Sequence, residues 1–270
     1  MRMRSLQENG KAGGLVVAVV LSLVLATTTV VVTAQDDAGV TIPETVLSFT
    51  VLDTMPLPTT GRVTGLTWMG TDTLVVLADY ADSLTASGNR EVKLVFQDST
   101  GTVFLEEDFS GVLDRGLAWD GEFLWSCGDA DDGSSILYQI QADTVRVEEA
   151  YNTPGHRPSA ICWDGRFLWI SDRDSGRIDR FDPEAKEITR SVVTPGFSPF
   201  GLAWDGLHMW LTDSGTGRLY RLAGSRRSWN ATADAESFMY RGIDVLLLHD
   251  GESFWMVPDG VNHAIRIRFD

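Results

Sequence analysis

The sequence predicts an all-β protein, a five-bladed β-propeller with four antiparallel strands per blade and a ring closed by an N-terminal strand in the last blade. Three observations predict this fold class: five copies of an internal repeat, a period that suits one blade, and short apolar segments separated by Asp-Gly turns. The 270 residues include 26 Gly and nine Trp, which is typical of short strands that pack large rings between glycine-bearing turns.

Four copies of the repeat align without gaps through their first Trp, and a fifth copy follows. Its copies are GLTWMGTDTLVVLAD from Gly65, GLAWDGEFLWSCGD from Gly116, AICWDGRFLWISD from Ala160, GLAWDGLHMWLTD from Gly201 and LLLHDGESFWMVPD from Leu246. The equivalent positions are spaced by 51, 44, 41 and 45 residues, counted between Trp68, Trp119, Trp163, Trp204 and His249. Such periods fit four short strands per blade, and we expect the Trp side chains to pack between blades.

Within a copy, G-L-A-W is the expected first strand, Asp-Gly the hairpin turn, and F-L-W-I-S the start of the second strand. In the third copy RIDRFD and EITRSVV are the expected third and fourth strands. The chain ends at RIRFD, a third strand, so the fifth copy lacks its outer strand. Residues 46–53, VLSFTVLD, resemble that strand, and we expect them to complete the last blade and to protect its edge.

The first 34 residues form an export signal. Basic residues precede an apolar run over 14–34, and small residues before Gln35 favour a cleaved signal peptide. Because 21 such residues can also span a bilayer, an uncleaved signal anchor stays open. Either way we expect an extracytoplasmic (secreted or periplasmic) protein with a linker over 35–44, a propeller over 45–270, and membrane contact only through 14–34 if they are retained.

The charge of the chain argues against one class of partner. The formal net charge is −16, and removal of residues 1–34 leaves 19 basic and 37 acidic residues, a net charge near −18. Such a surface repels nucleic acid and anionic membranes, so no nucleic-acid partner is expected. Cys127 and Cys162 lie in neighbouring copies, where a disulfide and two separate buried thiols are both compatible with the sequence.

The candidate site is the mouth of the central channel at which first strands begin and second strands end. Arginines precede the first strands in four copies and aspartates follow the second strands, so we expect this mouth to carry both positive and negative charges. The candidate ligand-binding residues are Arg62, Arg115, Arg157, Arg241, Asp129, Asp172, Asp213 and His156. In one interpretation the guanidinium groups bind an anionic ligand through bidentate hydrogen bonds. In the other, each Asp caps its own turn and each Arg pairs with a nearby Asp.

Other chemistry has little support in the sequence. The turns DADDG from Asp129 and DRDSG from Asp172 alternate acidic residues as calcium loops do, but neither continues to the distal glutamate of such a loop. No G-x-S-x-G or H-E-x-x-H pattern occurs. We therefore expect no metal, no cofactor and no catalytic residue.

The second copy, DRGLAWDGEFLWSCGDADDGSSILYQI, resembles the signature segment of the plant and bacterial type of glutaminyl-peptide cyclotransferase, a family of five-bladed propellers. Gly116-Leu117 match its T-Q-G-L strand, with Arg115 in place of Gln; Gly128 matches the glycine of F-E-S-T-G, and Ser134-Ser135 fall where its serine is expected. The resemblance implies that the acid-base glutamate of the family corresponds to Trp125, and an indole cannot shuttle a proton.

These observations predict a non-catalytic binding or scaffolding propeller for a small polar ligand or an extracellular protein. The alternative is an enzyme, either a divergent cyclotransferase or another propeller hydrolase or lactonase. Trp125 is the residue that separates the two interpretations.

Overall fold

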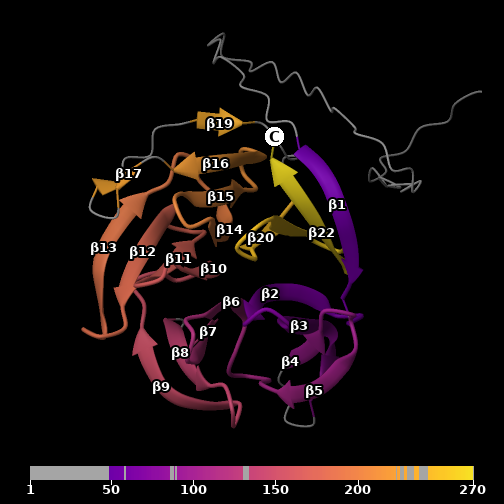
Figure 1. Ribbon diagram of the computed structural model, residues 1–270. Helices are drawn as coiled ribbons and strands as arrows, with labels where there is room; N and C mark the ends of the chain where they lie inside the picture. The colour runs from indigo at the N-terminus through magenta and orange to yellow at the C-terminus, as the bar shows by residue number, and fades with distance from the viewer. Residues whose placement is uncertain are drawn as a thin grey trace, which may run out of the picture.

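A computed structural model describes residues 49–269 except 58, 86, 87, 89, 130–133, 223, 226, 227, 230–233 and 237–242. Five four-stranded antiparallel sheets are arranged as blades around a central axis (Figure 1). The prediction of a five-bladed propeller is therefore confirmed. Within the described ranges, no helix is long and apolar enough to cross a membrane; the predicted export signal lies outside them.

The first three blades follow the chain in order, each from its innermost to its outermost strand. Blade 1 contains β2 (Arg62–Met69), β3 (Thr73–Leu84), β4 (Arg90–Asp98) and β5 (Val103–Asp108). Blade 2 contains β6 (Arg115–Trp119), β7 (Phe123–Asp129), β8 (Ser135–Gln141) and β9 (Arg146–Asn152). Blade 3 contains β10 (Pro158–Trp163), β11 (Leu168–Asp172), β12 (Arg177–Asp182) and β13 (Glu187–Val193).

The last two blades depart from this simple order. Blade 4 contains β14 (Pro199–Trp204), β15 (Met209–Asp213), β16 (Arg218–Leu222) and the short outer strand β19 (Asp234–Glu236). Between β16 and β19 in the chain, β17 (Gly224–Ser225) and β18 (Ser228–Trp229) form a separate small hairpin. Blade 5 contains β20 (Val245–His249), β21 (Phe254–Pro258), β22 (His263–Phe269) and, as its outer strand, β1 (Phe49–Pro56). The predicted closure by an N-terminal strand is thus confirmed.

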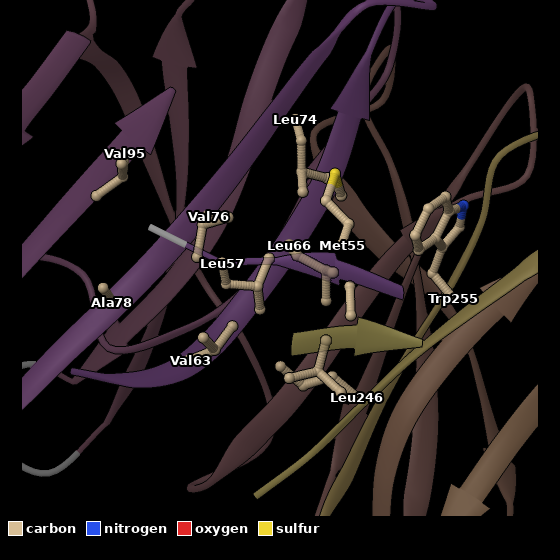
Figure 2. Packing of buried hydrophobic residues seen from close by; sticks show 12 residues of the cluster. Met55, Leu57, Val63, Leu66, Leu74, Val76, Ala78, Val95, Leu246 and Trp255 are labelled. Carbon is tan, nitrogen blue, oxygen red and sulfur yellow. The ribbon is translucent and has the colours of Figure 1, made fainter. Parts of the chain in front are cut away.

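The core lies between blades because each sheet packs both faces against its neighbours. At the junction of blades 1 and 5, one cluster combines side chains of β1, β2, β3 and β4 with those of β20, β21 and β22. Figure 2 shows Leu66 and Val63 on one side of this junction and Leu246 and Trp255 on the other. Continuous packing around the ring fixes the five innermost strands relative to one another, and these strands carry the candidate site.

Candidate functional site

The five innermost strands enclose a narrow central channel. Each of β2, β6, β10, β14 and β20 is the edge strand of its sheet and contacts the innermost strands on both sides. The channel has a volume of about 120 Å³ and is lined by the last three residues of the repeat strand in every blade, from Leu66–Trp68 in blade 1 to Leu247–His249 in blade 5. Edge strands expose backbone N–H and C=O groups, so the channel wall is polar.

We call the end of the channel at which the innermost strands begin the Arg/Asp mouth. The strand register of blade 1 places Arg62 opposite Asp79 there. Arg62 Nε donates to Asp259 Oδ1 at 2.6 Å, and Arg62 Nη2 lies 3.4 Å from Asp244 Oδ2. Arg62 therefore joins the first strand of blade 1 to two carboxylates of blade 5, across the closure of the ring.

Arg173 extends this network over three blades. It follows the second strand of blade 3, and its Nη1 donates to Asp244 Oδ2 of blade 5 at 2.8 Å. The same guanidinium group also donates to the hydroxyls of Ser198 at 3.0 Å and Ser214 at 3.3 Å, both in blade 4. One guanidinium thus holds blades 3, 4 and 5 in register at the mouth.

A second group of ion pairs covers blades 1 and 2. Arg90 Nε lies 3.2 Å from Asp79 Oδ1, and Arg90 Nη2 donates to Asp114 Oδ1. Arg115 pairs with the other oxygen of Asp114. Arginines and aspartates consequently alternate along the mouth, and each of these guanidinium groups has a carboxylate partner.

Two carboxylates of the mouth are buried and incompletely hydrogen-bonded. Asp79 is 3% exposed and Asp244 is 7% exposed. Within the described part of the chain, the Oδ1 atom of each has no hydrogen-bond donor. Burial raises the pKa of Asp79, although Arg90, Arg62 and Arg115 all act to lower it. The charge of Asp79 is therefore undercompensated despite its cationic neighbours.

Asp172 and Asp213 hold loops in the way that an aspartate cap does. Asp172 accepts from the amides of Arg157 and Ser175, both at 2.7 Å. Burial alone would raise the pKa of Asp172, but hydrogen bonds from the Ser175 side chain and from the amides of Arg157, Ser175 and His156 outweigh it, and the pKa is lowered. Asp213 accepts from Ser198 N at 2.7 Å and Thr216 N at 2.8 Å in the same arrangement. Both carboxylates are thus used by their own blades.

The loops above these two carboxylates require glycine at one position. A Cβ atom at Gly155 would lie 2.3 Å from Asp172 Oδ2, and one at Gly196 would lie 2.2 Å from Asp213 Oδ2. Only a residue without a side chain lets the loop approach the carboxylate so closely. The Pro-Gly turns of TPGHRP and TPGFSP are thereby fixed against the mouth.

The remaining predicted residues have less defined roles. Arg157 is half exposed and lies 3.8 Å from the exposed carboxylate of Asp174, and His156 is exposed on the same loop. Arg241 and the side chain of Asp129 lie outside the described residues. The structure therefore brings Arg62 and Arg115 into the network and leaves Arg157 at its rim.

Sequence reasoning missed four members of the network: Arg90, Asp114, Arg173 and Asp244. A signal existed for two of them, because Asp114 and Asp244 both stand five residues before the repeat position of Trp119 and His249. Arg90 begins the third strand of blade 1 and Arg173 lies in the turn after the second strand of blade 3, and their partners Asp114 and Asp244 belong to other blades, which the repeat pattern does not pair with them.

The opposite end of the channel carries the Asp-Gly turns, and its chemistry is structural. Asp120 accepts from the amides of Glu122 and Phe123 and, at 2.7 Å, from the indole Nε1 of Trp125. The same pattern links Asp164 to Trp169, Asp205 to Trp210 and Asp250 to Trp255. Trp125 is 1% exposed, so the residue at the resemblance-implied catalytic position is a buried packing residue.

A second concavity lies at this end between blades 4 and 5. It is an open groove of about 520 Å³, lined by polar and aromatic side chains that include His208, Arg221, Phe254 and Arg268. Of its two carboxylates, Asp205 accepts hydrogen bonds from Trp210 and from two turn amides, and Glu252 is an exposed side chain that pairs with Arg266.

The cysteines and the acidic turns have no metal or redox arrangement in the described residues. Cys127 and Cys162 are buried thiols with no disulfide between them. Cys162 Sγ lies 3.3 Å from Met209 Sδ, in a different core cluster from Cys127. In the described ranges, no three His, Cys, Asp or Glu residues are grouped so as to hold a metal ion. Of the two calcium-like turns, DADDG lies largely outside the described residues.

Comparison with known proteins gives structural neighbours only. No protein-family model matches the chain, and no curated protein matches it in sequence. Glutaminyl cyclase of Myxococcus xanthus superposes with a TM-score of 0.60 at 12% identity, covering 82% of this chain and 96% of that one. A chain in the crystal structure of a mitotic checkpoint complex superposes with a TM-score of 0.51 at 12% identity, covering 90% and 99%. These likenesses show a shared propeller fold.

Proposed function

We propose that this protein is an extracytoplasmic, non-catalytic binding propeller that recognises a small polar ligand at the Arg/Asp mouth. The observation that carries the proposal is the alternating network of Arg62, Arg90, Arg115 and Arg173 with buried aspartates. Polar groups that are already fixed in position lose little entropy when a ligand arrives. Two carboxylate oxygens of this network, Asp79 Oδ1 and Asp244 Oδ1, have no hydrogen-bond donor among the described residues and are candidate acceptors for a ligand.

The non-catalytic part of the proposal depends on Trp125. In the resemblance to glutaminyl-peptide cyclotransferases, this position corresponds to the acid-base glutamate. Here the indole is buried, and its N–H group is bonded to Asp120. A general acid-base residue must reach the reacting group and exchange a proton near neutral pH, and a buried indole does neither. The fold shared with a glutaminyl cyclase keeps a divergent cyclotransferase as the alternative.

The extracytoplasmic location is supported by the apolar run over 14–34 and the basic residues before it. Expression with a reporter fused after residue 44 tests export directly, because the reporter is then accessible from outside the cytoplasmic membrane. Protection of the reporter from external protease would contradict this part of the proposal.

Ligand-observed NMR on the purified protein tests the binding function. A screen of small amines, carboxylates and sugars is expected to yield compounds whose binding is weakened by Asp244→Asn. The control is Glu252→Gln, which removes one negative charge from an exposed side chain at the opposite end of the channel. If no compound distinguishes the two variants, the mouth is not the binding site.

A peptide with an N-terminal glutamine tests the enzymatic alternative. We expect the purified protein to release no ammonia above the spontaneous rate when it is incubated with this peptide. Sustained turnover would overturn the non-catalytic interpretation, and loss of that turnover in Asp79→Asn or Asp114→Asn would place the reaction in the mouth.

A further inference from the structure

We infer that the ligand of the Arg/Asp mouth is a small organic cation whose head group donates hydrogen bonds, such as an alkylammonium or alkylguanidinium ion. This inference rests on the proposed function and specifies the ligand class. It differs from the expectation drawn from the sequence, in which the guanidinium groups of the protein would take an anion.

The balance of charge at the mouth is the first step. Its arginines are Arg62, Arg90, Arg115 and Arg173, and its aspartates are Asp79, Asp114, Asp172, Asp213, Asp244 and Asp259. Among the described residues of this network the aspartates outnumber the arginines by two, and Asp172 and Asp213 accept hydrogen bonds from amide and hydroxyl groups of their own blades. Together with the acidic surface of the whole chain, this excess attracts cations and repels anions.

The geometry of Asp244 is the second step. Its Oδ2 atom receives both Arg173 at 2.8 Å and Arg62 at 3.4 Å, which fixes the carboxylate in place. Its Oδ1 atom is buried and has no donor among the described residues. A buried carboxylate oxygen without a donor is costly, and a ligand N–H group would remove that cost.

Asp79 offers a second acceptor on the other side of Arg62. Arg62 stands opposite Asp79 in the strand register and contacts Asp244 across the blade junction. Asp79 Oδ1 lacks a hydrogen-bond donor and has only the ion pair with Arg90 at 3.2 Å. Burial also raises the pKa of this carboxyl group, so a further positive charge nearby would stabilise its ionised form.

An anion would meet the opposite situation. An anion that binds one of these guanidinium groups competes with the present carboxylate partner, and displacement of Asp79, Asp114 or Asp244 would leave a buried carboxylate without a partner. A divalent metal also fits poorly, because the described residues include no group of three metal-ligating side chains. A compact organic cation with two or more N–H groups would donate to the two buried oxygens that lack a donor, Asp79 Oδ1 and Asp244 Oδ1, without breaking an ion pair.

Calorimetric titration of the full protein with agmatine and n-butylammonium tests this inference, with n-butanol and acetate as the neutral and anionic probes. We expect both cations to bind and the other two probes not to bind. Loss of a charge-assisted hydrogen bond predicts that Asp244→Asn weakens cation binding by roughly 10- to 100-fold. Glu252→Gln, which removes the same charge far from the mouth, is expected to change affinity less than about twofold.

Asp79→Asn provides a second variant, because Asp244→Asn removes a partner of two arginines and could impair folding. Weaker cation binding in a variant whose melting temperature is unchanged supports the inference. Equal affinity in both variants and the wild type overturns it. If acetate binds instead and Arg115→Gln abolishes its binding, the mouth is an anion site, and the ligand class is wrong while the proposed function holds. If no probe and no screened compound binds there, the proposed function fails as well.

Discussion

Asp179 lies in the middle of β12, where it is 4% exposed, and its Oδ1 atom has no hydrogen-bond donor among the described residues. Burial raises its pKa by more than Ser191 and Arg177 lower it. Unlike the carboxylates of the mouth, Asp179 belongs to a third strand and has no part in the proposed site. Its ionised form is a local destabilisation that the rest of blade 3 tolerates.

Replacement of Asp179 tests this interpretation. A carboxyl group whose folded pKa lies above its unfolded value destabilises the protein when ionised, and this cost disappears as the pH falls toward the unfolded value of 3.8. We expect Asp179→Asn to raise the free energy of unfolding by on the order of 1 kcal/mol at pH 7 to 8, with the gain vanishing near pH 4.

Urea denaturation of both proteins across this pH range measures the effect. Asp143→Asn, at an exposed turn position, is the control and should change stability by less than about 0.5 kcal/mol. A gain from Asp179→Asn that persists at low pH would show that the carboxylate is not the cause.

At the level of single residues, the sequence identified the mouth but not its full composition. Arg62 and Arg115 could be predicted because they precede the repeat strands. Arg173 could not, because its role depends on a long side chain that crosses blade 4 to reach Asp244. Whether a side chain can contact another blade depends on the diameter of the ring, and this diameter cannot be read from a local sequence pattern.

Among the elements, the hairpin between the first two strands has a repeated construction in blades 2 to 5. An aspartate begins the turn, accepts from two turn amides and receives the indole N–H group of a Trp five residues later. The Asp-Gly pair predicted the turn, and the Trp was predicted as packing. The structure adds a hydrogen bond that links the two features. The aspartate that follows the first strand accepts the indole N–H group of the Trp on the second strand and so holds its ring in place.

Asp164→Ala tests the energetic role of this turn. Asp164 is 1% exposed, and its loss leaves the Trp169 indole and two amides without their acceptor. We expect a loss of about 2 to 3 kcal/mol in the free energy of unfolding.

Blade 1 supplies the matched control for chemical denaturation. Its turn has Met69 at the position of the aspartate, and Asp72 in that turn is exposed. Asp72→Ala is therefore expected to cost less than about 0.5 kcal/mol. Equal losses in the two variants would contradict a specific role for the Asp–Trp hydrogen bond.

For the whole molecule, closure of the ring has two independent components. β1 pairs with β22 along blade 5, from Phe49 opposite Phe269 to Pro56 opposite His263. Arg62 then joins blade 1 to blade 5 at the mouth. The strand pairing could be predicted because the last copy lacks an outer strand. The small hairpin of β17 and β18 could not be predicted. It lies between the third and fourth strands of blade 4, where the sequence does not follow the repeat.

Met55→Ala tests how much the ring depends on β1. Met55 is buried at the junction shown in Figure 2, together with Leu66, Leu246 and Trp255. A cavity at this position is expected to cost about 2 to 4 kcal/mol. Hydrogen exchange should accelerate first in β1 and β22, because they form the outer part of blade 5.

Leu52→Ala on the same strand is the control, since Leu52 is 37% exposed and should leave exchange in β22 nearly unchanged. If Met55→Ala accelerates exchange uniformly in all five blades, the ring opens as one cooperative unit and not at its closure.

The antiparallel pairing of β1 with β22 also decides how the ring responds to mechanical force. Because Phe49 and Phe269 face each other at one end of the ladder, a pull applied to both ends of the propeller separates these strands from that end. The ladder hydrogen bonds then break one after another, as in a zipper, instead of sharing the load in shear. The pairing of β1 with β22 is therefore where we expect the ring to open first under force.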